Sequence, residues 1–475
     1  METEKQNTAS SPMKRAYAAF AEKYEQGVWY LLLLWCLLPI IMCANFVVSA
    51  ATGRFPTPEE IAKEGLTFGN VNYDEALASY QLLFFVLGGI TVCVALALLV
   101  LARRRVFSLK ALRAQPWFYL FGLFLLWSCV CTAKSDYRYF SLVGGSYMRD
   151  GLVSYFIYGA VFLCASALRR ADYRRKLMLC YTGVIAFIAL IMLVQEKADI
   201  YFLDYCFSSE RAVVFNQFNH LGYMLCMSSI ACLGFFLYES GDKRLKLLYL
   251  AGFCFLVYAL VVNDTFGALL AVITAIPVAL LFYWRSGRKL NWRALGIAVL
   301  IVVAAVLIVF AVTGTNGPLG NFIQLKNDLV KILSGAEDAD NAGTERFKLW
   351  KETVEWIRWR PIFGFGPEGL VRRHALSDNR LPHNTYLQIT AFTGFPGLFF
   401  YLSALITLAV HHWRKIKALD TMVLIASGTA FAYMVSQTFG APIYNVEPYF
   451  WLFLGLVTLM NEQEKPLLCL ETPEA

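Results

Sequence analysis

The stretch VWYLLLLWCLLPIIMCANFVVSA, residues 28–50, contains no charged side chain. An α-helix rises about 1.5 Å per residue, so about 20 apolar residues cross the roughly 30 Å of hydrocarbon in a membrane. Lipid offers no partner to an unpaired backbone group, and such a segment must therefore be helical. Residues 42–49 offer no small-residue cleavage site, so we expect this helix to be retained and not removed as a signal peptide.

The rest of the chain has the same character. Of its 475 residues, 58% are hydrophobic and 16% are charged, whereas a soluble domain has roughly 25% charged residues. We therefore expect an all-α, polytopic membrane protein. Uninterrupted apolar runs predict twelve transmembrane helices, near residues 28–50, 79–102, 116–133, 151–168, 177–195, 219–238, 246–262, 266–284, 294–313, 385–410, 420–439 and 449–461.

The basic residues orient these helices. With the N-terminus in the cytoplasm, the inner segments and both tails hold 25 Lys and Arg, and the short outer segments hold 7. The positive-inside rule therefore predicts a protein of the cytoplasmic membrane with both termini in the cytoplasm. This distribution also accounts for the net charge of +8, so we expect no nucleic-acid partner. The expected parts are an N-terminal tail (1–27), nine helices (28–313), an extracytoplasmic loop with amphipathic helices (314–384), three helices (385–461) and a C-terminal tail (462–475).

The polar side chains gather on the outer side. Four of the expected helices carry no acidic or basic residue at mid-membrane depth, and proton- or ion-coupled transporters usually need such residues. Polar residues lie instead in three outer segments, 134–151, 197–220 and 314–384. The sequence therefore predicts a functional site at the outer membrane face.

The long outer loop is expected to contain structure of its own. In NAGTERFKLWKETVEWIRWRP, residues 341–361, Thr344 is in position to cap a helix. Apolar residues then recur at helical spacing, which predicts an amphipathic helix lying on the membrane. Those apolar residues are Phe347, Trp350, Val354 and Ile357. Arg346 stands in the first turn, where the helix dipole opposes a cation, and this indicates either a nearby anion or an arginine that extends to solvent.

A histidine stands at the end of this loop, after IFGFGPEGLVRRHALSDNRLP, residues 362–382. The glycines permit a tight turn, which either joins two helices or faces an anion with its amides. Arg380 adds positive charge nearby. Asn384 can cap the next helix, which leaves His383 just outside its first turn, at headgroup depth. A histidine in this place can accept a proton near neutral pH.

A second polar cluster precedes the expected helix at 219–238. Arg211, Asn219 and His220 lie at the same outer level by topology, and His220 is a rival candidate for a base. The alternative is a histidine that only hydrogen bonds to a neighbour at the start of a helix. Arg149, in an earlier outer segment, could join the cluster or contact lipid headgroups.

Other catalytic patterns have little support. Asp338 and Asp340 form a D-x-D pattern of the kind that holds a metal and a nucleotide sugar, but a solvated acidic turn explains it better. The sequence contains no Walker A, G-x-S-x-G or H-E-x-x-H motif, which argues against ATP hydrolysis, a lipase-type triad and a zinc protease. We expect no metal and no cofactor.

Four motifs follow one another along the chain: Arg211 with FNQFNHLG, NDTFGALLAV (263–272), GTERFKLWKETVEWIRWRPIFGFGPEG and PHNTYLQITAFTGFPGL. Together they resemble the bacterial O-antigen ligase and polysaccharide polymerase family, over roughly residues 205–410. One departure is Thr265-Phe266-Gly267, where the family often has Ser-Arg-Gly.

This resemblance implies a metal-independent membrane glycosyltransferase that uses an undecaprenyl-diphosphate-linked glycan donor outside the cytoplasm. It implies that His383 acts as the base or orients the acceptor, and that Arg346 and Arg211 contact the diphosphate. Accessory roles are possible for Asn219, His220, Arg149, Arg380 and Asn384. The acceptor could be a glycan, a lipid or a protein, and the expected partners include membrane lipids and other polysaccharide assembly proteins. Two other classes stay open: a lipid-linked glycan flippase or transporter, and a non-catalytic scaffold of envelope polysaccharide assembly.

Overall fold

A computed structural model describes residues 12–51, 71–145, 148–198, 211–215, 217–239, 241–287, 318–336, 338–373 and 381–458, with the single residues 296 and 300. Within these ranges every regular element is a helix. The predicted all-α class is therefore confirmed.

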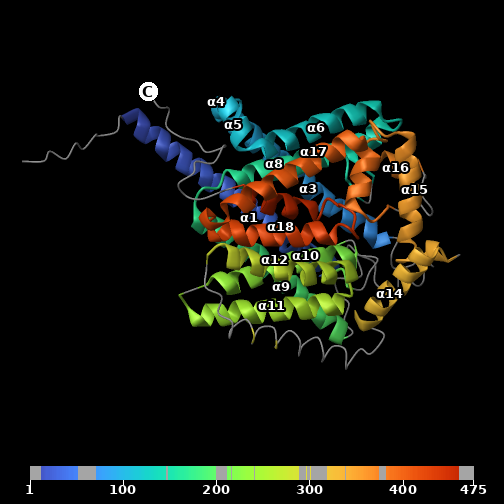
Figure 1. Ribbon diagram of the computed structural model, residues 1–475. Helices are drawn as coiled ribbons and strands as arrows, with labels where there is room; N and C mark the ends of the chain where they lie inside the picture. The colour runs from blue at the N-terminus through green and yellow to red at the C-terminus, as the bar shows by residue number, and fades with distance from the viewer. Residues whose placement is uncertain are drawn as a thin grey trace, which may run out of the picture.

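Long helices run side by side and form one bundle (Figure 1). They are α1 (Pro12–Ala51), α3 (Val71–Leu101), α6 (Pro116–Lys134), α8 (Leu152–Ser166), α9 (Ala171–Ala198), α10 (Phe218–Tyr238), α11 (Lys243–Asn263), α12 (Phe266–Arg285), α17 (Thr385–Lys415), α18 (Thr421–Ser436) and α19 (Glu447–Val457). Shorter elements are α4 (Arg103–Val106), α5 (Leu109–Ala114), α7 (Arg138–Val143), α14 (Pro318–Ser334), η3 (Ala339–Asn341), α15 (Arg346–Trp359), α16 (Gly369–Arg372) and η5 (Ile416–Ala418).

Eight of the described helices are long and apolar enough to cross a membrane. Three shorter apolar helices, α8, α18 and α19, occupy three more of the predicted positions. The chain is therefore a multi-pass membrane protein. The expected helix at 294–313 lies outside the described residues except for 296 and 300, so the total of twelve stays a prediction.

Helix α10 lies at the centre of the bundle. It packs against α9, α11, α12 and α18, and every residue from His220 to Tyr238 is buried. A helix that is apolar on all sides belongs in such a core. Helix α3, in contrast, keeps large apolar side chains exposed, among them Leu82, Val86 and Ile90, as expected for a helix that faces lipid.

Helix α17 is broken at Gly394, whose φ of 68° and ψ of −178° are not helical. Pro396 follows the break and has no backbone N–H to donate. The carbonyls of the preceding turn therefore need partners from outside the helix. Trp127 of α6 supplies one, because its indole N–H donates to the carbonyl of Thr393 at 2.7 Å.

The glycine-rich segment 361–369 supplies two more partners. The N–H of Phe365 donates to the carbonyl of Ala391 at 2.9 Å. The N–H of Gly366 donates to the carbonyl of Phe392 at the same distance. These amides are bonded to protein carbonyls, so the alternative in which they face an anion is wrong. The segment is the turn between two helices that the sequence also allowed.

We expect Gly394→Ala to destabilise this junction. An added Cβ would lie 2.0 Å from the carbonyl oxygen of Ile362, and the backbone conformation is one that essentially only glycine adopts, at a cost on the order of 1–3 kcal/mol for other residues. Thermal unfolding of the purified protein should show a lower Tm. Gly183→Ala on α9 is the matched control, because nothing lies within 4 Å of its added Cβ. Equal Tm values for the two variants would contradict this account.

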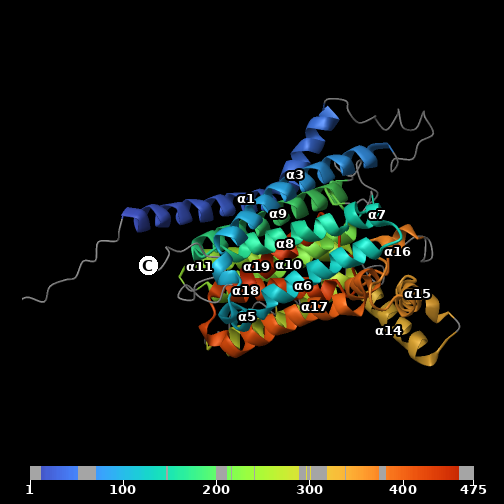
Figure 2. The same ribbon diagram turned by 90° about the horizontal axis from the view of Figure 1, so that it is seen from above.

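The loop elements α14, α15 and α16 gather at one end of the bundle, with α7, as Figure 2 shows from above. The short η3 packs against α14 and α15. Helix α15 begins at Arg346 after Glu345, and both Thr344 and Glu345 have positive φ values, 56° and 66°. The prediction that Thr344 caps this helix is therefore wrong, because a cap needs extended backbone.

The buried face of α15 also differs from the predicted one. Leu349, Thr353 and Ile357 are buried, whereas Val354 is 37% exposed. The helix packs against α17, and this contact rotates the buried face away from Val354. Of the four predicted apolar positions, only Ile357 lies on the fully buried face.

Candidate functional site

Strained backbone is concentrated at the end of the bundle where α10, α12 and α17 begin. The sequence predicts that this end faces outward, and we call it the outer end. Seven described residues other than glycine have positive φ, and all seven lie in loops at this end. They are Arg149, Val213, Asp264, Thr344, Glu345, Glu368 and His383. Such residues cost on the order of 1–3 kcal/mol each, persist only where the surroundings enforce them, and cluster at functional sites.

His383 is held from both sides. The indole N–H of Trp350 in α15 donates to the carbonyl of Pro382 at 2.7 Å. On the other side the Asn384 side chain accepts a hydrogen bond from the N–H of Leu387 at 3.0 Å, so the predicted cap is present. With a φ of 48° and a half-buried side chain, His383 is fixed in place yet accessible from the outer end.

The structure brings His220 of α10 close to His383. The two imidazoles interact electrostatically, although 163 positions separate them in the sequence. His220 is 4% exposed, and its Nδ1 has no hydrogen-bond partner among the described residues. A buried imidazole nitrogen without a partner is available to a neighbouring group that exchanges a proton.

Arg346 is the first residue of helix α15. Its guanidinium acts electrostatically on Tyr223 of α10, one turn from His220, and its side chain is half-buried. Among the residues that the structure describes, no carboxylate lies within ion-pairing distance of Arg346. Lys351 of the same helix, in contrast, pairs with Asp340 at 2.6 Å. Arg346 is therefore a cation held at the outer end without an acidic partner there.

Arg211 has a different setting. Its guanidinium lies 2.9 Å from a carboxylate oxygen of Glu196 at the end of α9. Its carbonyl accepts a hydrogen bond from the side chain of buried Asn263 at 3.1 Å. The next four residues, 212–215, are fully buried, so Arg211 is anchored while 35% of its side chain stays exposed.

Three predicted accessory residues remain, namely Asn219, Arg149 and Arg380. Asn219 is half-buried in the first turn of α10. Arg149 donates from Nε to the side-chain oxygen of Gln81 in α3 at 2.7 Å, so it is tied to that helix. Arg380 lies outside the described residues.

Sequence reasoning missed Glu368, in the glycine-rich segment 361–369. Its carboxylate accepts hydrogen bonds from the backbone N–H groups of Gly145, at 2.7 Å, and of Asp150. It therefore clamps this segment to the loop before α8. Nothing in the pattern GFGPEG separates such a buried acid from a solvated one, and only the three-dimensional fold reveals its amide partners.

Glu368 is 1% exposed. Burial raises the pKa of its carboxyl to about 7, even though its two backbone hydrogen bonds and nearby Arg149 lower the pKa. Asp150 lies beside it and is fully buried. Burial, and then the charge of Glu368, raise the pKa of Asp150 well above its usual range. Folding therefore favours the protonated forms of Glu368 and Asp150.

The stability of the protein should consequently depend on pH. The folded-state pKa of Glu368 lies above its ordinary value of 4.5, so its contribution is fully present below that pH and is lost as the pH rises through about 7. The loss is about 3 kcal/mol at full ionisation. We expect the Tm of the purified protein to be lower at about pH 8 than at about pH 5.

Glu368→Gln should reduce this difference in Tm, because glutamine does not ionise, and the other buried acids, Asp150 and Glu447, should account for the part that remains. Glu355→Gln, an exposed position on α15, is the matched control and should leave the difference unchanged. A Tm that rises from the acidic to the alkaline pH in wild-type protein would show that the clamp prefers the charged form.

The groups at the outer end can support one kind of chemistry. A neutral imidazole accepts a proton from a hydroxyl that attacks, and a guanidinium without an acidic partner holds phosphate oxygens as a planar fork. In the structure Asp338 of the D-x-D pattern pairs with Lys331 at 2.7 Å, and Asp340 pairs with a lysine of α15. The outer end therefore suits the transfer of a group from a donor that carries phosphate.

Comparison with known families agrees with the motifs. Residues 251–402 match the family model described as O-antigen ligase, which confirms the resemblance that the sequence predicted. The matched stretch contains both Arg346 and His383, whereas Arg211 and His220 precede it. No curated protein matches the chain.

Proposed function

We propose that this multi-pass membrane protein, whose residues 251–402 match the O-antigen ligase family, transfers or polymerises a glycan from an undecaprenyl-diphosphate-linked donor at the outer face of the cytoplasmic membrane. The family match and the membrane helices support a membrane glycosyltransferase role. The observation that supports the proposal further is Arg346, a half-buried cation without an acidic partner in the described chain. It lies at the end of the bundle that also holds two histidines that interact electrostatically.

In the proposed reaction a hydroxyl of the acceptor attacks the anomeric carbon of the donor glycan. A new carbon–oxygen bond forms as the bond to the diphosphate breaks, and the lipid diphosphate leaves with the bonding electrons. His383 takes the proton of the attacking hydroxyl, which typically speeds such a step by about 10²–10⁴-fold. Attack from the face opposite the leaving group inverts the configuration of the anomeric carbon.

The arginines act on the leaving group. No ATP is available outside the cytoplasm, so the donor must carry its own activation as a sugar diphosphate. Negative charge grows on that diphosphate as the bond breaks, and a guanidinium already in place stabilises it. We assign this role first to Arg346. Arg211 would contribute by sharing its guanidinium between the diphosphate and Glu196, its partner at 2.9 Å.

His220 would orient the base. It is buried and interacts electrostatically with His383, and its Nδ1 is left without a partner in the described structure. Because burial keeps it from contact with a large glycan, we assign it a positioning role and not the transfer of the proton.

Reconstitution distinguishes this proposal from the two other classes. The purified full chain is placed in liposomes with a lipid-diphosphate oligosaccharide and candidate acceptors. Covalent transfer or lengthening of the glycan supports the proposed enzyme. Movement of the lipid-linked glycan across the bilayer without a new bond indicates a flippase. Neither result, with a folded protein, indicates a scaffold and contradicts the proposal.

A deletion strain identifies the class of acceptor. Single lipid-linked units should accumulate when a polymerase is lost, because the units are made but not joined. Long unattached chains should accumulate when a ligase is lost. Loss of glycan from proteins alone would identify an oligosaccharyltransferase.

A further inference from the structure

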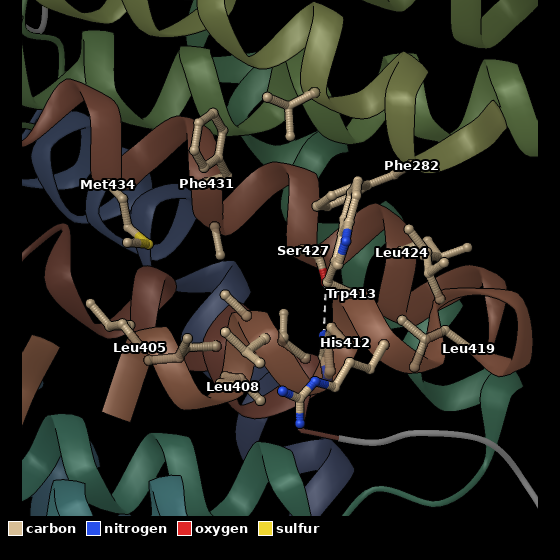
Figure 3. A pocket seen from close by; sticks show the side chains of 18 residues that line it. Phe282, Leu405, Leu408, His412, Trp413, Leu419, Leu424, Ser427, Phe431 and Met434 are labelled. Carbon is tan, nitrogen blue, oxygen red and sulfur yellow. Dashed lines mark hydrogen bonds between the residues drawn. The ribbon is translucent and has the colours of Figure 1, made fainter. Parts of the chain in front are cut away.

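A pocket of 480 Å³ lies between α12, α17, α18 and α19, toward the end of the bundle opposite His383. Figure 3 shows the side chains that line it. Helix α17 connects the two places, since it begins at Thr385 next to His383 and ends at Lys415. At about 1.5 Å per residue its 31 residues measure up to roughly 46 Å. The basic residues of the pocket therefore lie toward the other membrane face. The lining extends along α18 as far as Met434, whose carbonyl accepts a hydrogen bond from Tyr386 near the start of α17.

Hydrocarbon is the chemistry that the pocket fits. Most of its lining is apolar, including Phe282, Leu405, Leu408, Phe431, Met434 and Leu454. Its volume falls in the range of about 300–1,000 Å³ that is usual for bound small molecules. Val410 and Trp413 belong to the lining and are 43% and 44% exposed, so the pocket can be entered from the surface that these side chains share with the surrounding lipid.

The charges at the edge of the pocket are positive. Arg414 belongs to the lining and is exposed. The guanidinium of Arg285 lies 5.9 Å from the ring centre of Trp413. In the described part of the chain neither arginine has an ion-pairing carboxylate. Asp420, the first acidic residue after them on this face, is already paired with Arg174.

One polar side chain inside the pocket lacks a partner. His412 is 6% exposed, and its Nε2 makes no hydrogen bond with any described residue. Its Nδ1 lies 3.5 Å from the hydroxyl of Ser427, the dashed line in Figure 3. Buried polar atoms are normally satisfied, so the free nitrogen indicates a bound molecule that has an oxygen atom near the arginines and an apolar remainder.

We propose that this pocket binds a phospholipid with an anionic headgroup. One acyl chain lies among the apolar side chains, the phosphate lies between Arg414 and Arg285, and His412 hydrogen bonds to a phosphate or ester oxygen. The distribution of basic residues places this end at the cytoplasmic face, where basic pockets between helices bind anionic lipid headgroups. Trp413 stands beside them, at the depth where aromatic side chains anchor a membrane protein.

Native mass spectrometry of the full chain in mild detergent, with phosphatidylglycerol or phosphatidylcholine added, tests the proposal. We expect phosphatidylglycerol to bind at least about 10-fold more tightly, because both lipids carry a phosphate but phosphatidylcholine also brings a trimethylammonium group that the two arginines repel. Equal binding of the two lipids, or binding of neither, would overturn the proposal.

Three variants locate the bound lipid. Arg414→Glu should weaken phosphatidylglycerol binding by about 10-fold through loss of the charged contact. Ala409→Trp, at an exposed position of the lining, should weaken it by filling the pocket without disturbing the core. Arg104→Glu, at an exposed position on α4, is the matched control for a change of charge and should bind as wild-type protein does. Binding that survives both pocket variants, or that Arg104→Glu lowers equally, would overturn the assignment to this pocket.

Discussion

His383→Ala should lower the rate of glycan transfer by about 10²–10⁴-fold, because the attacking hydroxyl loses the group that accepts its proton. His383→Asn tests the loss of proton transfer more specifically. Asparagine tolerates the left-handed backbone that His383 adopts, at φ 48°, and it can hydrogen bond but cannot take up a proton. A similar loss in both variants, with an unchanged Tm, would assign the effect to proton transfer and not to folding.

Two other histidines serve as comparisons for this prediction. His220→Gln should have a smaller effect on the rate, as expected for a positioning residue. His411→Asn, at the far end of α17 where the ring packs against Trp117, should have little effect on transfer. If His220→Gln costs more than His383→Asn, then His220 is the base and the roles assigned to the two residues must be exchanged.

Arg346→Ala should lower the rate by about 10²–10³-fold, the usual cost of losing one donor that stabilises charge in the transition state. Arg346→Lys should recover part of that loss, since lysine restores the charge but not the planar fork. Arg358→Ala is the matched control, because Arg358 is an exposed arginine near the other end of the same helix. Equal rates for Arg346→Ala and Arg358→Ala would remove Arg346 from the site.

The transmembrane architecture could be predicted from the sequence because apolar length alone determines which segments can cross a membrane. Every expected helix in the described ranges has a counterpart, including α8, α18 and α19, which are too short to count as spans by themselves. The cap at Asn384 was also predictable, since an asparagine oxygen before an apolar run has a local partner three residues ahead.

Contacts between distant segments could not be predicted in this way. Backbone amides of the turn at 361–369 donate to carbonyls that the break at Gly394 leaves unpaired within α17. Neither local sequence predicts this contact between the two segments. The same limit explains the error at Thr344 and the rotated buried face of α15, both of which follow from tertiary packing. It also explains why Glu368 was missed, since its amide partners lie more than 200 positions earlier in the chain.

The same distinction between local patterns and distant contacts applies to the candidate site. The sequence could identify four candidate site residues individually, because each has a side chain suited to the chemistry and a predicted outer position. They are His383, Arg346, Arg211 and His220. The sequence could not show that His220 and His383 lie close enough to interact, or that Glu196 already pairs with Arg211 while Arg346 has no acidic partner in the described structure.

The central claim is that His383 promotes glycan transfer from a lipid diphosphate. The most direct test follows the product in liposomes that contain the purified full chain, the lipid-diphosphate glycan and an acceptor, with binding of the donor measured in parallel. We predict that wild-type protein forms the transferred glycan with inverted configuration, and that His383→Asn binds the donor normally but transfers it about 10²–10⁴-fold more slowly. Full transfer by folded His383→Asn protein would contradict the account.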